Sequence, residues 1–244
     1  MENLGFVLTC ILTIAALFAV AYLLQKWLCR DIKPFANTHY ITYTAVFACL
    51  AAVLMLVEIP LFFAPSFYKL DLSEIPILIC TFYLGPVAGV AAELVKVLVK
   101  LLLKGPSTAF VGDYANFVVG CSFVLPASLV YHARPGKRSA LLGMLVGTLV
   151  LTVVGSTFNA VYLLPKFAAL YGIPMEAIVG MGTKVNSAIT SVSTLVLFAV
   201  VPFNLLKGAV VSGLTFLLYK RISPILHRND EKRVQRRALK RQGA

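Results

Sequence analysis

Apolar runs long enough to cross a lipid bilayer recur along this chain. A membrane-spanning helix needs about 20 apolar residues, and the runs 4–24, 41–64 and 140–164 reach that length. Of the 244 residues, 59% are hydrophobic and 13% are charged, whereas about a quarter of the residues of a soluble domain are charged. The sustained alternation of apolar and polar residues that marks membrane strands does not occur in the sequence. The sequence therefore predicts an all-α integral membrane protein and excludes outer-membrane barrels and secreted disulfide scaffolds.

Basic residues indicate which helix ends face the cytoplasm. The formal charge is +12, and nine of the last 25 residues are Lys or Arg. The linker 25–40 and the loop 132–139 are also basic. Because short cytoplasmic segments are rich in Lys and Arg, we interpret these basic residues as markers of the cytoplasmic side of the membrane and not as a nucleic-acid-binding surface. The sequence thus predicts an N-terminus outside, a cytoplasmic C-terminus and contacts with membrane lipid.

One apolar run is too short to cross a membrane by itself. The run 75–84 stops at Gly85-Pro86, and at about 1.5 Å per residue it covers roughly half of the hydrocarbon. Broken helices are tolerated inside a membrane only where protein or a cavity covers them. Crossings are predicted at 87–103 and 114–131 on either side of a polar segment.

The last apolar segment, 189–219, is too long for one crossing. Two crossings would leave the basic tail outside, and Pro favours the first turn of a helix. We therefore expect residues 186–201 to form an outer-surface helix or lid and 202–219 to form the final crossing. The predicted parts are an extra N-terminal helix (1–25), a basic linker (26–40), a six-helix membrane domain (41–226) and a basic cytoplasmic tail (227–244).

Polar residues at membrane depth are the first candidates for function, because burying them there is costly. Asn204 and Lys207 share one face of the last helix, and Asn159 lies near the outer end of the preceding crossing. Two amides and an ammonium group suit an uncharged or anionic ligand that carries carbonyl and hydroxyl groups. The alternative is that the amides join helices while Lys207 extends to the outer headgroups.

Other polar residues have simpler explanations. Glu93 with Lys96 and Lys100 lies on one helix face, where ion pairing is the simpler reading and a proton or ion path the sharper one. Asp113 is expected to cap the following helix while Asn116 points into the bundle. The segment 68–73 is either an outer loop that closes over a ligand or an interfacial turn.

Several function classes are excluded by missing motifs. The sequence has no GxxxxGK[ST] loop, no GxSxG and no HExxH. We therefore predict that the chain is not an enzyme, has no ATPase of its own and holds neither a metal nor a cofactor.

A ridge of small residues at Ala48 and Ala52 suits close approach of another helix.

Four segments together carry a specific resemblance. They are Tyr68-Lys69-Leu70-Asp71-Leu72-Ser73-Glu74-Ile75-Pro76, Gly85-Pro86-Val87-Ala88-Gly89, Ala115-Asn116-Phe117 and Pro202-Phe203-Asn204-Leu205-Leu206-Lys207-Gly208. Over residues 41–226 the chain resembles the riboflavin-specific substrate-binding (S) subunit of energy-coupling-factor (ECF) vitamin transporters. The resemblance implies a six-transmembrane-helix S-component bundle in a bacterial plasma membrane, here with one extra N-terminal helix.

The resemblance also implies a site and partners. Riboflavin, captured from outside, would contact Leu70, Asp71, Leu72, Asn159, Asn204 and Lys207, and FMN or analogues are further candidate ligands. A transmembrane coupling protein, contacted through Ala48 and Ala52, and two cytoplasmic ATPases would supply the energy for delivery. The alternatives are an S component for another vitamin or precursor and an autonomous ion-coupled carrier that uses Glu93, Lys96 and Asp113.

Overall fold

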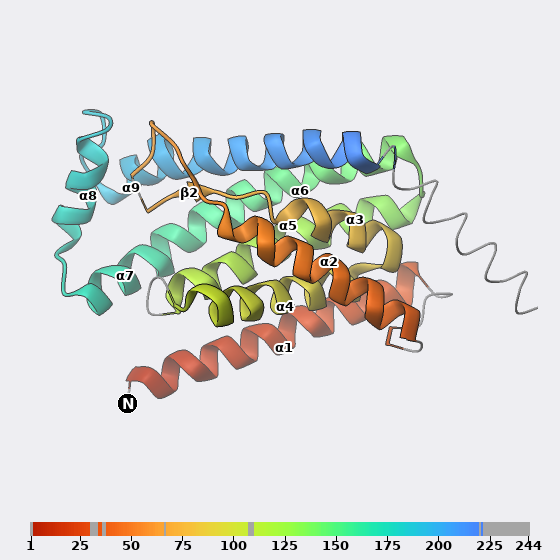
Figure 1. Ribbon diagram of the computed structural model, residues 1–244. Coiled ribbons are helices and arrows are strands. Elements are labelled where there is room, and N and C mark those ends of the chain that lie inside the picture. Colours follow the sequence, from red (N-terminus) through yellow and green to blue (C-terminus); the bar gives the residue numbers. More distant parts are fainter. Residues whose placement is uncertain are drawn as a thin grey trace, which may run out of the picture.

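The computed structural model describes residues 2–29, 34–35, 38–65, 67–106, 110–219 and 221. The predicted basic tail (227–244) and the linker residues Arg30 and Lys33 lie outside these described residues. Long helices run side by side along one axis and form a bundle (Figure 1). The chain is therefore an all-α membrane protein, as the sequence predicts.

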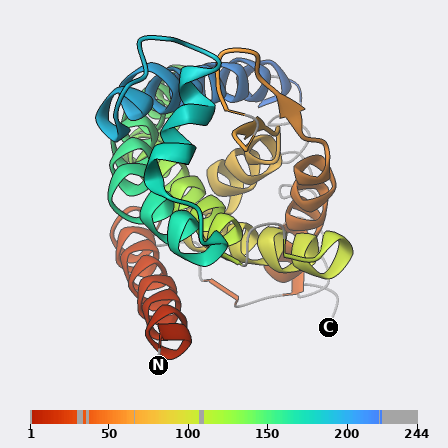
Figure 2. The same ribbon diagram turned by 90° about the vertical axis from the view of Figure 1, so that its left-hand side faces the viewer.

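The first part of the bundle contains a broken pair of helices and one peripheral helix. Its elements are α1 (Glu2–Leu28), α2 (Thr38–Leu56), α3 (Glu74–Leu84), α4 (Pro86–Lys104) and α5 (Val111–Ala133). Figure 2 shows α1 at the edge of the bundle, where it packs on α4 and α5. Most of α1 is exposed, which suits a helix that faces lipid.

The second crossing is shorter than the sequence predicts. We expected it to extend to Ala64, but α2 ends at Leu56 and is followed by a loop, here called the 57–73 loop, whose described residues are 57–65 and 67–73. In this 57–73 loop, β1 (Ile59–Pro60) pairs antiparallel with β2 (Lys69–Leu70). A proline disfavours helical backbone at the residue before it, so Pro60 disfavours continuation of the helix through Ile59 toward Ala64.

The α3–α4 break matches the short helix predicted at 75–84. Gly85 joins the two helices with φ of +97°, a conformation that suits glycine because it lacks a Cβ atom. The buried Gln25 side chain of α1 binds both sides of the break: its Nε2 donates to the Leu84 carbonyl at 3.4 Å, and its Oε1 accepts from the Val87 amide at 2.9 Å. These bonds satisfy backbone groups that a helix break leaves open.

The second part of the bundle contains two long helices, each with one widened π-helical turn. The first comprises α6 (Lys137–Phe158), η1 (Asn159–Leu163) and α7 (Leu164–Tyr171). It is followed by α8 (Met175–Thr183), and the last helix runs without interruption over Val192–Tyr219, beginning with α9 (Val192–Leu195) and η2 (Val196–Val200).

The expected division of the last helix at Pro202 is therefore wrong. Residues 192–201 belong to the same helix as 202–219 and do not form a separate surface helix. A proline in a helix interior lacks an N–H and clashes with the preceding turn. The π turn η2 ends two residues before Pro202, and η1 ends two residues before Pro165. A widened turn removes the need for a regular hydrogen bond at the proline, so the helix continues.

Five described helices are long and apolar enough to cross a membrane: Gly5–Leu28, Thr38–Leu56, Val111–Ala133, Lys137–Tyr171 and Val192–Tyr219. Helix α4 has 19 residues but carries four charged side chains, three of which are buried inside the bundle. The main apolar core joins α2, α3, α4, α5, α6 and the last helix.

Candidate ligand pocket

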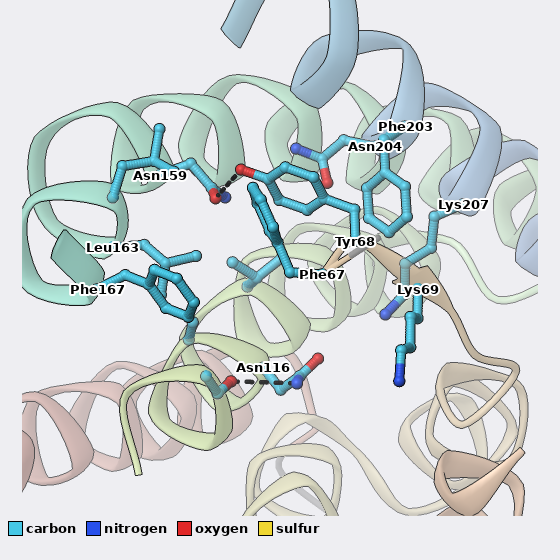
Figure 3. Close-up of a pocket in the computed structure, with 14 residues that line it drawn as sticks. Phe67, Tyr68, Lys69, Asn116, Asn159, Leu163, Phe167, Phe203, Asn204 and Lys207 are labelled. Atoms are coloured by element: carbon cyan, nitrogen blue, oxygen red, sulfur yellow. Dashed lines mark hydrogen bonds between the residues drawn. The ribbon is translucent and has the colours of Figure 1, made fainter. Parts of the chain in front are cut away.

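A cavity of about 150 Å³ lies between the 57–73 loop, α5, η1 and the last helix. Figure 3 shows its polar and aromatic side chains pointing toward one another. Its lining residues come from segments far apart in the sequence: Phe67, Tyr68, Lys69, Gly112, Ala115, Asn116, Val119, Asn159, Leu163, Leu164, Phe167, Phe203, Asn204 and Lys207.

Two amide side chains face the cavity from neighbouring helices. Asn159 opens the π turn η1, where its Nδ2 donates to the Gly155 carbonyl at 2.8 Å and its Oδ1 accepts from the Tyr68 hydroxyl at 2.8 Å. Asn204 donates from Nδ2 to the Ser156 hydroxyl at 3.4 Å. Gly155 leaves room for this arrangement, because a Cβ atom there would lie 3.0 Å from Asn204 Nδ2.

The ammonium group of the cavity is held by a buried carboxylate. Lys207 Nζ lies 2.9 Å from Asp71 Oδ2, and both side chains are largely buried. Asp71 also accepts from the Ser73 amide at 3.0 Å and from the Ser73 hydroxyl. Burial acts to raise the pKa of Asp71, but the charges of Lys207 and Lys96 and these hydrogen bonds outweigh it and lower the pKa to about 2. Asp71 is thus an anion that fixes the position of Lys207.

Aromatic rings form much of the remaining wall. Tyr68 lies 5.5 Å from Phe203 and 4.6 Å from Phe67, measured between ring centroids. Phe67 in turn lies 5.8 Å from Phe167 on α7. Rings at these separations attract one another and offer flat faces to an aromatic ligand. The cavity thus combines stacking surfaces with amide and ammonium donors.

Three of the predicted site residues meet in this cavity, and three do not line it. Asn159, Asn204 and Lys207 come together from two helices. Asp71 reaches the site only through Lys207, while Leu70 is buried in β2 and Leu72 packs against the main core. The headgroup position considered for Lys207 is wrong, because its charge is buried and paired.

The predicted small-residue ridge is inside the chain. Ala48 and Ala52 have no exposed surface, and α2 packs on α3 and α4. The outward surface of α2 instead exposes Val46, Leu50 and Val53. In this conformation Ala48 and Ala52 pack within the chain and not on a surface that a partner can reach.

The other charged residues form ion pairs. Lys96 lies 2.6 Å from Glu93, as the simpler reading of that helix predicts, and 2.9 Å from Glu74, which the sequence did not single out. Asp113 does not cap α5: that position is held by Phe110, and Asp113 lies 2.6 Å from Lys100. Asn116 does line the cavity.

Sequence reasoning did not single out Phe167, Phe203 or Gly155 for the pocket. Phe167 lies beyond the apolar run 140–164, and only the continuous helix through η1 and α7 brings it to Phe67. Phe203 precedes Asn204 and resembles any apolar residue of a crossing. For Gly155 the available signal was its spacing four residues before Asn159, which places both on one helix face.

These features define a class: an all-α membrane protein with one broken helix pair, in which α5, two π-turn helices and a loop enclose a polar, aromatic pocket. The family described as "ECF transporter, substrate-specific component" matches residues 39–219. The chain therefore belongs to the family of ECF transporter substrate-specific components. Helix α1 lies outside the matched region.

Individual relatives are consistent with this membership. The riboflavin transporter RibU of Staphylococcus aureus (strain TCH60) is 34% identical over 199 residues, which cover 82% of this chain and 97% of that protein. The riboflavin transporter FmnP of Bacillus subtilis (strain 168) is 28% identical over 181 residues, covering 74% of this chain and 90% of that protein. A solved S component of a bacterial ECF transporter superposes with a TM-score of 0.60 at 34% identity, covering 77% of this chain and 97% of that structure.

Proposed function

We propose that this chain is the subunit of an ECF-type transporter that captures riboflavin outside a bacterial cell. The observation that carries the proposal is the meeting of Asn159, Asn204 and Lys207 in one cavity with aromatic walls. The relatives named as riboflavin transporters support the choice of ligand. Delivery into the cytoplasm then depends on ATP hydrolysed by partner subunits.

The chemistry of the pocket suits a flavin. The amides of Asn159 and Asn204 both donate and accept hydrogen bonds, and the Lys207 ammonium donates, which matches ring carbonyls, ring N–H groups and ribityl hydroxyls. Phe67, Tyr68 and Phe203 offer faces for the ring system. A desolvated polar site of this kind rejects ligands that leave its groups unpaired.

Entry of the ligand requires movement of the 57–73 loop. The cavity of about 150 Å³ is smaller than the roughly 300–1,000 Å³ of typical ligand pockets. Tyr68 occupies part of the space and binds Asn159. We propose that riboflavin displaces Tyr68 and that the loop, with Leu70 and Leu72, then closes over the bound ring.

The proposed partners are a transmembrane coupling protein and two cytoplasmic ATPases. The proposed orientation places the N-terminus and the 57–73 loop outside and the basic tail in the cytoplasm. It follows from Lys26 near the end of α1 and from the basic start of α6, because cytoplasmic helix ends are rich in Lys and Arg. Docking through Ala48 and Ala52 would require α2 to move away from α3 and α4.

The experiment is an absorbance spectrum of the detergent-purified chain, followed by quenching of riboflavin fluorescence during titration. Flavin absorption bands and saturable quenching are expected for the unmodified chain. Asn204→Ala and Lys207→Ala should each weaken binding by at least tenfold, because each removes a buried hydrogen-bonding group worth about 1.5–3 kcal/mol toward a polar ligand.

Matched controls are Asn186→Ala and Lys184→Ala, which change the same residue types outside the cavity. A folded chain without flavin colour or quenching would refute riboflavin as the ligand, and a screen of other vitamins and precursors would follow. Unchanged affinity in both folded cavity variants would refute the site. FMN and flavin analogues belong in the same titration.

A further inference from the structure

Behind the pocket, five ionisable side chains form one buried charge network. They are Asp71, Glu74, Glu93, Lys96 and Lys207, and each is at most 6% exposed. Lys207 pairs with Asp71 at 2.9 Å, and Lys96 pairs with Glu74 at 2.9 Å and with Glu93 at 2.6 Å. The network joins the 57–73 loop, α3, α4 and the last helix.

The network contains three carboxyl groups but only two ammonium groups. If every group were ionised, its net charge would be −1 in the interior of a membrane protein. An uncompensated charge buried in low dielectric is costly, and a carboxyl group in such a place takes up a proton instead. Lys100 does not balance the network, because it pairs with Asp113 at 2.6 Å.

The position of the missing positive charge follows from the contacts of Glu74 and Glu93. Both carboxyl groups bind Lys96 and also face each other within hydrogen-bonding reach. Oxygen Oε2 of Glu74 and both oxygens of Glu93 are buried without a hydrogen-bond partner among the described residues, although Glu93 Oε2 lies 2.6 Å from Lys96 Nζ as an ion pair. Two ionised carboxylates cannot bond to each other, whereas one proton placed between them supplies the donor that both lack.

The surroundings favour Glu93 as the carrier of this proton. Glu74 lies in the field of both Lys96 and Lys207, whereas Glu93 faces Glu74, Lys96 and the Cys121 thiol of α5. Helix α5 packs directly on the Glu93 carboxyl, since a Cβ atom at Gly120 would lie 2.7 Å from its carboxyl carbon and from both oxygens. The Glu93 side chain has no exposed surface.

We propose that Glu93 and Glu74 form a proton-binding site in which one proton, carried mainly by Glu93, is retained at neutral pH. With this proton bound, the network has no net charge. The proton thereby prevents a net negative charge next to Lys207. The site is independent of the ligand of the pocket, and its test needs no flavin.

Infrared spectroscopy of the full-length chain in lipid nanodiscs tests the proposal. The ligand-free protein at pH 7 should show the carbonyl stretching band of a protonated carboxyl group, and this band should shift in D₂O. Glu93→Gln should remove the band, whereas Glu176→Gln, which changes an exposed glutamate on α8, should leave it unchanged. A folded unmodified chain without the band at pH 7 would overturn the proposal, as would a band that survives in both Glu93→Gln and Glu74→Gln.

Thermal unfolding supplies a second measurement. Gln resembles a protonated Glu in shape and charge and needs no proton uptake on folding, so Glu93→Gln should have a thermal midpoint at pH 7 equal to or above that of the unmodified chain. Raising the pH should destabilise the unmodified chain more than the variant, because only the unmodified chain releases this proton when it unfolds. A Glu93→Gln variant that unfolds well below the unmodified chain at pH 7 would count against the proposal, because it would indicate an ionised Glu93.

Discussion

The Tyr68 hydroxyl donates to the side-chain oxygen of Asn159 at 2.8 Å, across 91 residues of sequence. The bond ties the 57–73 loop to the helix that carries the pocket amide. It also occupies an acceptor that the proposed ligand would use. In the proposed function, Tyr68 and riboflavin would therefore compete for Asn159.

This competition predicts the effect of Tyr68→Phe. The variant keeps the ring but removes the hydroxyl, so Asn159 Oδ1 is left unpaired in the empty pocket. Because a hydrogen bond contributes about 1 kcal/mol, riboflavin should bind roughly fivefold more tightly when measured by fluorescence quenching. Tyr43→Phe, on α2, is the matched control. Weaker binding by Tyr68→Phe would instead show that the hydroxyl contacts the ligand.

The Asp71–Lys207 pair predicts a pH-dependent contribution to stability. The folded chain lowers the pKa of Asp71 to about 2, below the ordinary value of about 3.9. Ionised Asp71 therefore stabilises the folded chain above about pH 4, and this contribution is lost as the pH falls toward 2. Asp71→Asn should lower the thermal midpoint at pH 6, and the difference from the unmodified chain should shrink between pH 4 and 2. A difference that stays constant over this range would contradict the assignment.

Helix α1 should stabilise the α3–α4 break through one side chain. Gln25→Leu keeps an apolar contact but leaves the Leu84 carbonyl and the Val87 amide without their partner. Each buried unpaired group costs about 1–3 kcal/mol, so the thermal midpoint should fall clearly. Leu23→Ala, on the exposed side of the same helix, should change it little. Equal midpoints for Gln25→Leu and the unmodified chain would show that the break does not need α1.

The burial of Ala48 predicts a packing effect for substitutions that enlarge it. Ala48→Leu must fit extra atoms into a closed contact between helices, which costs about 1–3 kcal/mol. Ala45→Leu, on the exposed side of α2, is the matched control and should leave stability unchanged. The measurement is the thermal midpoint of each variant, purified without any partner subunit and compared with that of the unmodified chain. A stable Ala48→Leu chain that fails only in assembly with a coupling protein would favour the partner role predicted from the sequence.

Much of the pocket was predictable because polar residues are rare within apolar runs. Asn159, Asn204 and Lys207 stand out for this reason, and helical spacing puts the last two on one face. The partner of Lys207 was harder to identify, since Asp71 lies 136 residues away in a loop. Only the folded arrangement of the loop against the last helix brings them together.

The helix boundaries were predicted less well where prolines occur. Pro202 suggested the start of a helix, yet a π turn lets the helix pass through it. Pro60 was placed inside a crossing, yet it belongs to a two-residue strand. In both places local hydrogen bonding, which hydropathy does not record, decides the structure. The charge network was only partly predictable from the sequence. Glu74 starts a short helix, where an acidic residue in the first turn is ordinary, so its part in the network could not be recognised.

The two π turns allow the pocket to be changed through chain length as well as through side chains. A single-turn π bulge contains one residue more than the regular helix. Deleting one residue within 196–200 would therefore restore a regular helix and turn the preceding segment 192–195 by about 100°. The same change within 159–163 would turn α7 and carry Phe167 away from Phe67. One-residue insertions and deletions at these two turns are thus a route by which related chains can reshape the pocket wall while the rest of the bundle stays in place.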